Sequence, residues 1–339
     1  MENFGKEIKD VLSEMGLYCV LQNIIENEIA TKYEFSLKNI KDYSKLQKAI
    51  KIMSMCSHKD IKLAKSEKYH FAIEIKKEDK TLNALKYANN TIDKDTAILG
   101  IDNDGENIIF NLKKSIHTII GGATGMGKTN ILNNIIYSLT KSSNEEELQL
   151  YLIDIKKELG IWDKLPNVMN NTAKDCSQAL DILEKVSKIM EKRFEQLSKN
   201  RKKDKFNQIV VVIDELADLM LSGLKTYIEE EIVHIAQIGR AVNIHLIIAT
   251  QSPIAKVCTN LIKANCPTVI ALKTVSIPTS RVILDNKNAF ELQGVGDCII
   301  RNADYPCEKR FKALYLDEQE ILKYVKEKKN EYIQQKKKK

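Results

Sequence analysis

The sequence lacks any long apolar run, and no stretch approaches the roughly 20 residues that a membrane-spanning helix needs. Its start, "MENFGKEIKDVLSEMG", has the pattern of an amphipathic, partly acidic helix and not that of a signal peptide. The seven cysteines are odd in number and include no C-x-x-C pair, a pattern typical of reduced, mostly buried thiols. We therefore expect a soluble chain of the cytoplasm that would reach a membrane only through a partner.

The sequence also lacks internal repeats and a dominant sign of charge. Lysine and arginine total 53 against 46 acidic residues, which gives a net charge of +7. This mild balance permits a nucleic-acid partner without requiring one, because lysine is also a common solvated residue. The basic run "KNRKKDK" from Lys199 to Lys205 is accordingly interpreted as a solvated loop. With 339 residues and 43% apolar content, the chain can bury a full α/β core beside a smaller second domain.

A glycine-rich turn between an apolar strand pattern and an apolar helix face matches the P-loop pattern G-x-x-x-x-G-K-[ST]. Its residues are Gly122, Ala123, Thr124, Gly125, Met126, Gly127, Lys128 and Thr129. Glycines allow backbone N–H groups to surround a phosphate at the start of the following helix. Lys128 is expected to reach the β- and γ-phosphates, and Thr129 to give its hydroxyl to Mg²⁺. The pattern therefore predicts a site for ATP and Mg²⁺.

Two further strand ends carry polar residues. The β-branched run 209–213 predicts a strand buried on both faces, and Asp214 and Glu215 follow it. Because ligands of open α/β sheets lie at the carboxyl ends of strands, we expect this pair beside the P-loop. Asp214 is the candidate Mg²⁺ ligand, and Glu215 is the candidate base for an attacking water. Thr250 and Gln251 end another strand, where Gln251 is placed to sense the γ-phosphate or to position that water.

The order of patterns along the chain predicts two domains. Residues 1–95 alternate strand and helix patterns and predict a small α+β domain, which the polar connector 86–96 joins to the rest. Residues 96–329 repeat strand and helix, which predicts an α/β domain with a parallel sheet wrapped by helices. A helix that begins after Asp317 leads into the basic tail 330–339.

Together these segments resemble the FtsK/SpoIIIE family of double-stranded DNA translocases. The resemblance rests on "HTIIGGATGMGKTNILNNIIYSL", "QIVVVIDELADLM", "GRAVNIHLIIATQSP", "LIKANCPTVIALKTVSIPTSRVILD" and "ELQGVGDCII" in the family's order and spacing. It covers residues 97–320 strongly, while the first domain resembles the smaller motor subdomain of the family. The resemblance implies a hexameric ring motor with a RecA-like P-loop core that draws duplex DNA through its channel. It also implies that Arg240, which precedes the "IHL" strand, acts on the ATP of a neighbouring subunit.

The expected contacts to DNA are basic residues, because phosphate contacts dominate such binding. The candidates are Lys263, Lys273, Arg281 and the tail Lys336 to Lys339. The sequence departs from the family at Ser252, where arginine is common, and at Ile155, where proline is common. It shows no counterpart of the family's membrane-spanning segment or of its winged-helix domain. A motor of this kind resembles the coupling proteins of conjugative plasmids and integrative elements, whose partners are relaxase or secretion-channel proteins.

Two other functions are compatible with a P-loop. A nucleotide-switched assembly or partition protein would bind DNA without moving along it, and DNA-stimulated ATP hydrolysis would distinguish a motor from it. A small-molecule kinase must exclude water from the phosphate and fits the Asp214–Glu215 pair poorly. Glu215, Gln251 and Arg240 together favour hydrolysis coupled to a ring.

Overall fold

The computed structural model describes residues 2–27, 30–38, 43–57, 61–64, 66, 68–77, 81–88, 93–169, 172–199 and 206–338. The chain divides into two compact units. The small unit comprises Met1–Thr81 and Ile101–Glu106, and the large unit comprises Leu82–Gly100 and Asn107–Lys339. The sequence placed a single division near residue 95, whereas the structure returns the segment Ile101–Glu106 to the small unit. Part of the expected connector, residues 89–92, lies outside the described residues.

Hydrogen bonds explain why Ile101–Glu106 belongs to the small unit. The side chain of Asn103 donates to Glu74 Oε1 at 2.9 Å, and its carbonyl oxygen accepts from the Asn27 side chain at 2.6 Å. Lys32 forms an ion pair of 2.7 Å with Asp104. A hairpin tip distant in sequence is thus fixed to strands of the small unit, which no local pattern reveals.

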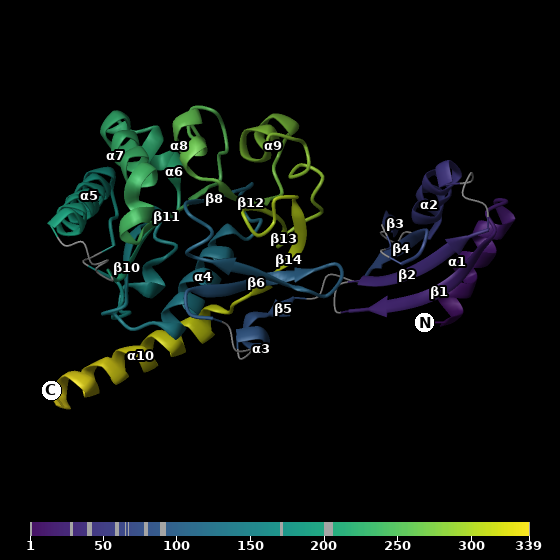
Figure 1. Ribbon diagram of the computed structural model, residues 1–339, viewed down its shortest axis with the longest axis horizontal. Coiled ribbons are helices and arrows are strands. Elements are labelled where there is room, and N and C mark those ends of the chain that lie inside the picture. The colour runs from purple at the N-terminus through teal and green to yellow at the C-terminus, as the bar shows by residue number, and fades with distance from the viewer. Residues whose placement is uncertain are drawn as a thin grey trace. The chain divides into compact units, whose positions relative to one another are not determined.

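The small unit is an antiparallel sheet with two helices (Figure 1). Its elements are α1 (Glu2–Glu14), β1 (Cys19–Glu26), β2 (Ala30–Leu37), α2 (Tyr43–Ser57), β3 (Ile61–Ala64) and β4 (Phe71–Lys76), with strand order β1-β2-β4-β3. These elements match the alternating strand and helix patterns of residues 1–95, and Phe35 stacks on Phe71 at 5.3 Å in the core. Glu34 of β2 is buried, and Asn23 and Ser66 donate hydrogen bonds to its carboxylate.

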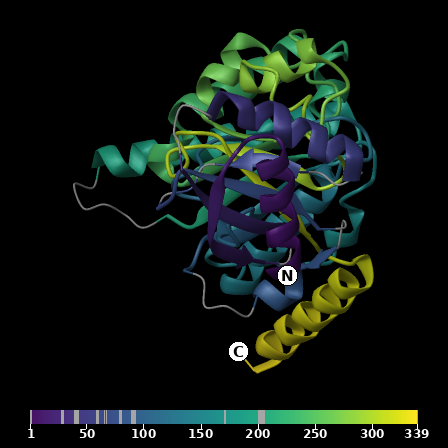
Figure 2. The same ribbon diagram turned by 90° about the vertical axis from the view of Figure 1, so that its right-hand side faces the viewer.

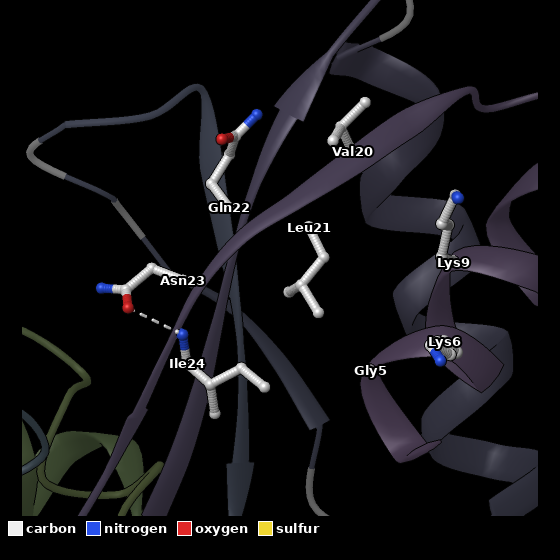
Figure 3. Close-up of a pocket in the computed structure, with 8 residues that line it drawn as sticks. All are labelled: Gly5, Lys6, Lys9, Val20, Leu21, Gln22, Asn23 and Ile24. Carbon is white, nitrogen blue, oxygen red and sulfur yellow. Dashed lines mark hydrogen bonds between the residues drawn. The ribbon is translucent and has the colours of Figure 1, made fainter. Parts of the chain in front are cut away.

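A hollow of about 580 Å³ lies on the small unit between α1 and β1 (Figure 3). Its lining residues are Gly5, Lys6, Lys9, Val20, Leu21, Gln22, Asn23 and Ile24. The pairing of β1 with β2 shifts register between Leu21 and Asn23, a bulge on an edge strand. None of the residues that the sequence marked as candidate catalytic or binding groups lines this hollow.

The large unit is built on a ten-stranded sheet. The strands are β5 (Leu82–Asn83), β6 (Thr96–Asp102), β7 (Asn107–Asn111), β8 (Thr118–Gly121), β9 (Leu148–Ile153), β10 (Gln208–Ile213), β11 (Ile244–Thr250), β12 (Thr268–Leu272), β13 (Asp297–Arg301) and β14 (Lys309–Tyr315). Their order is β7-β6-β14-β13-β12-β8-β11-β10-β9, with β5 paired to β14. From β12 to β9 all neighbours are parallel, as expected for the strands that carry the site. The sheet is nevertheless mixed, because β13 runs antiparallel to both β12 and β14.

Helices cover both faces of this sheet (Figures 1 and 2). They are α3 (Ala84–Ala88), α4 (Lys128–Ser142), α5 (Cys176–Lys199), α6 (Leu216–Met220), α7 (Lys225–Ile238), α8 (Asn260–Asn265), α9 (Ile277–Leu284) and α10 (Glu318–Lys338), with 3₁₀ turns η2 (Gly160–Trp162) and η3 (Gly239–Val242). In Figure 1, α5, α7 and α8 lie above the sheet, while α4 and α10 lie below it. Every residue of β10 is buried, so the predicted strand with two covered faces is confirmed. Among the described helices, none is long and apolar enough to cross a bilayer.

Two buried histidines support the strands beside the P-loop. His117 Nδ1 accepts a hydrogen bond of 2.9 Å from the Leu246 amide, and His245 Nε2 lies 2.7 Å from Gln208 Oε1. Burial lowers the pKa of His117 to about 4 and that of His245 to about 3. Both rings are therefore neutral in the folded protein at pH values where an unfolded histidine is already protonated.

This pair predicts acid sensitivity. Below pH ~6.5 these histidines bind protons in the unfolded chain but not in the folded chain. The free energy of unfolding should therefore fall as pH drops from about 6.5 to about 4. The slope should approach ~1 kcal/mol per pH unit for each histidine. His117→Asn offers the Leu246 amide an acceptor that does not titrate, and it should reduce the slope measured by denaturant unfolding at several pH values. An unchanged slope in this variant would contradict the assignment to His117.

Candidate nucleotide-binding site

The P-loop links the end of β8 to the first residue of α4, as the sequence predicted. Gly125 and Gly127 have φ angles of 75° and 102°, a backbone region that residues with a Cβ rarely adopt. A Cβ on Gly122 would lie 2.7 Å from Leu272 Cβ, so strand β12 requires glycine there. Gly127 precedes α4 without a side-chain cap, which leaves the first amides of this helix available to an anion.

Lys128 lies within the curve of the loop. It is only 5% exposed, and its ammonium donates to the carbonyl oxygens of Gly122 and Ala123 at 2.8 and 2.9 Å. Burial lowers the pKa of Lys128 to about 8, although the carboxylates of Glu215, Asp214 and Glu158 oppose the shift. At pH 7 the side chain therefore carries its charge where phosphate oxygens would bind.

Asp214 lies directly after β10 and is 3% exposed. Its Oδ2 atom is buried and has no hydrogen-bond partner in the part of the chain that the structure describes. Burial, reinforced by the charges of Glu158 and Asp154, raises the pKa of Asp214 to about 7. A buried carboxylate oxygen without a donor is costly, and a cation would relieve that cost. The residue thus fits the role of a magnesium ligand.

Thr129, the other expected magnesium ligand, is the second residue of α4. Its hydroxyl donates to Glu158 Oε2 at 2.5 Å. No group of three or more His, Cys, Asp or Glu residues is arranged for a metal within the described ranges. Magnesium at Thr129 and Asp214 would therefore take most of its ligands from phosphate oxygens and water, which is its usual mode in nucleotide sites.

Glu215 is 4% exposed, and its carboxylate accepts hydrogen bonds from four groups of the chain. Oε1 accepts from Thr250 Oγ1 at 2.7 Å and from the Ala217 amide at 3.1 Å, where Glu215 caps α6. Oε2 accepts from Lys156 Nζ at 2.9 Å and from the Gln251 amide at 3.0 Å. The carboxylates expected from β10 and the polar residues expected from β11 thus lie at one edge of the sheet.

Gln251 links this carboxylate to the P-loop. Its backbone amide donates to Glu215, while its side-chain Oε1 accepts a hydrogen bond of 2.7 Å from the hydroxyl of Thr124. Gln251 therefore contacts both the loop tip and the carboxylate of Glu215.

The segment after β9 brings three charged residues to this edge that the sequence did not predict there. Asp154 is 1% exposed and accepts from the amides of Glu158 and Leu159 at 2.9 and 2.8 Å, which closes the turn. That turn directs Lys156 to Glu215 and Glu158 to Thr129. The pattern "LQLYLIDIK" contained the signal, because β9 is parallel to β10 and its carboxyl end must lie at the same edge.

The proposed DNA-contacting residues lie on α8, on the segment after β12 and on α9. Lys263 pairs with Asp285 at 2.9 Å, and Lys273 donates to the Gln293 carbonyl at 3.3 Å. Arg281 is exposed on α9. Of the expected basic tail, Lys336 and Lys337 are exposed on α10, while Lys339 lies outside the described residues. Of the basic run 199–205, residues 200–205 also lie outside the described residues.

Arg240 is not part of this cluster. It is exposed on η3, before the amino end of β11, whereas Gln251 follows the carboxyl end of the same strand. The 7 residues of β11 separate the two by on the order of 20 Å at the usual rise per residue. Arg240 therefore does not reach the P-loop of its own chain.

The strand order around this site defines the fold class of the large unit. The P-loop strand β8 lies between β11 and β12, and the strand that ends in Asp214 is separated from β8 by β11. This is the RecA-like arrangement of a P-loop ATPase domain, so the expected fold class is confirmed. The chain belongs to the FtsK/SpoIIIE family, whose model matches residues 82–205 and 196–255.

Curated relatives agree with this assignment. DNA translocase FtsK of Tropheryma whipplei is 34% identical over 279 residues, which are 75% of this chain and 38% of that protein. DNA translocase SftA of Bacillus subtilis is 38% identical over 246 residues, 68% of this chain and 26% of that protein. DNA translocase FtsK of Listeria monocytogenes is 30% identical over 347 residues, 94% of this chain and 46% of that protein. The chain thus spans less than half the length of these relatives.

Solved structures show the same fold. The conjugation coupling protein TcpA of pCW3, in a monomer form with ATPγS, has a TM-score of 0.66 and 23% identity, covering 94% of this chain and 99% of that one. The Type VII secretion ATPase EccC of Thermomonospora curvata has a TM-score of 0.61 and 23% identity, covering 74% of this chain and 34% of that one.

The site predicts that Lys128 supplies nucleotide affinity. Lys128→Ala should weaken binding of a fluorescent ATP analogue about tenfold to a hundredfold, because a charge-assisted contact to phosphate is lost. Lys188→Ala, which removes an exposed lysine on α5 that pairs with Glu184, should bind normally. Titration of the analogue, with circular dichroism as a check on folding, tests this. Equal affinity of the two variants would rule out the P-loop assignment.

Proposed function

We propose that the chain is an ATP-hydrolysing motor that translocates double-stranded DNA as a ring. One observation carries the proposal: an FtsK/SpoIIIE fold brings Lys128, Thr129, Asp214 and Glu215 to one sheet edge. The names of the relatives support DNA as the substrate. The fold shared with a conjugation coupling protein supports service to a mobile element, with relaxase or secretion-channel proteins as partners.

In this proposal Lys128 holds the β- and γ-phosphates of ATP, and Thr129 and Asp214 hold Mg²⁺. Bound magnesium would neutralise charge on the phosphate oxygens. Glu215 accepts a proton from the attacking water, and Gln251 orients that water beside the P-loop. A base that activates water favours hydrolysis of ATP over phosphate transfer by a kinase, which must exclude water from the phosphate.

DNA contact would come from basic residues of the large unit, of which Arg281 is exposed and Lys263 and Lys273 are partly exposed. Lys263 lies on α8 after β11, Lys273 lies directly after β12, and Arg281 lies on α9. On binding DNA, Lys263 would exchange its partner Asp285 for a phosphate. Such binding depends on charge and little on base sequence. A nucleotide-switched DNA binder would share these contacts but would not couple them to hydrolysis.

ATP turnover tests the motor against that alternative. The wild-type chain should hydrolyse ATP faster when duplex DNA of any sequence is added. Glu215→Gln should retain nucleotide affinity and lower kcat by about a hundredfold or more, because an amide is a poor base. Coupled-enzyme assays with and without DNA measure both. A chain that binds DNA without any change in ATPase rate would favour the assembly-protein alternative.

Arg240 provides a test of the ring. Its exposed position, distant from the P-loop of its own chain, supports action on a neighbouring subunit's nucleotide. Arg240→Ala and Lys128→Ala should each be inactive alone, whereas mixed rings should regain part of the ATPase activity. Recovery is expected because some interfaces then pair an intact P-loop with an intact arginine. Absence of recovery in rings shown to contain both variants would count against action across subunits.

A further inference from the structure

The carboxylate of Glu215 has no acceptor position left for a water. An ionised carboxylate offers about four lone-pair sites. Thr250 Oγ1 and the Ala217 amide donate to Oε1, while Lys156 Nζ and the Gln251 amide donate to Oε2. A general base must accept a proton from a water within hydrogen-bond distance. In the arrangement described, one of these four donors has to leave before Glu215 can act.

Lys156 is the donor best able to leave. The amides of Ala217 and Gln251 are backbone groups, and Thr250 is a fully buried residue of β11. The Lys156 side chain is 32% exposed and comes from the turn after β9, not from a strand or helix. A long side chain on a turn can swing into solvent without disturbing the sheet.

The same turn also contacts the P-loop helix. Glu158, two residues after Lys156, accepts a hydrogen bond from the hydroxyl of Thr129, and Asp154 fixes the turn by accepting from the amides of Glu158 and Leu159. Lys156 is close enough to Lys128 for the two positive charges to repel. Phosphates held by Lys128 would consequently weaken the ion pair between Lys156 and Glu215.

We propose that Lys156 is a positioning residue that masks Glu215, and that its withdrawal permits hydrolysis. The inference rests on the proposed function and concerns its regulation. When Lys156 leaves, Oε2 can accept a water proton while the water oxygen bonds to the γ-phosphorus and the bond to the β-phosphate oxygen of ADP breaks. Turnover would then depend on what moves the turn after β9, and DNA engagement of the ring is the expected cause.

Steady-state ATPase assays of the full chain, with and without duplex DNA, test the mask. Lys156→Met removes the charge and keeps the length of the side chain. It should raise kcat without DNA roughly tenfold, the size of one charge-assisted hydrogen bond, and leave the KM for ATP unchanged. The rate with saturating DNA should stay near that of wild type, so the stimulation ratio falls. Lys156→Arg should remain stimulated, and Lys188→Met on α5 serves as the matched control.

The same substitution in a Glu215→Gln chain distinguishes masking of Glu215 from a general structural effect of Lys156→Met. In Glu215→Gln the base is already removed, so adding Lys156→Met should not change the residual rate. A change there, or a DNA-free rate of Lys156→Met at or below that of wild type, would overturn the proposal. If DNA does not stimulate the wild-type chain but Lys156→Met still raises kcat, the proposal of a DNA motor is contradicted, while the proposal that Lys156 masks Glu215 is supported. If neither chain hydrolyses ATP under any condition, both proposals fall.

Discussion

The carboxyl edge of five parallel strands is the constraint on which the rest of the site depends. Parallel pairing from β9 to β12 brings the ends of separate sequence segments to one line, and those ends carry charged groups. Asp154, Asp214, Glu215 and Lys128 are each no more than 5% exposed. Unpaired charges in such surroundings cost several kcal/mol each. The edge is therefore organised by the need to give every charge a partner.

Those partners determine the local geometry. Lys128 satisfies its ammonium with loop carbonyls, Glu215 collects four donors, and Asp154 uses its carboxylate to close a turn. Asp214 is the exception, since one of its oxygens is buried without a donor among the described residues and burial raises its pKa to about 7. An exception of this kind at a sheet edge is typical of functional sites, where a bound ligand completes the set of partners.

The elements nearest the site were the most predictable from sequence. The run 209–213 fixed β10 and its buried faces, and the glycine pattern fixed the P-loop, because both depend on local backbone and side-chain properties. The antiparallel β13, the burial of Glu34 and the return of 101–106 to the small unit depend on partners distant in sequence. Lys156 and Glu158 were missed for the same reason, since their roles follow from the register of β9 against β10.

Binding of a phosphate at this loop is an exchange of hydrogen bonds and not a simple gain. The ammonium of Lys128 has three N–H donors and already has two acceptors, so contacts to both the β- and the γ-phosphate would replace at least one of the carbonyls of Gly122 and Ala123. Exchanging one neutral acceptor for another would contribute little to the free energy of phosphate binding. The gain comes from charge, because a phosphate oxygen is anionic and the site is largely shielded from water. The same field acts on every cation nearby, so the charge that Lys128 binds also alters the balance between Lys156 and Glu215.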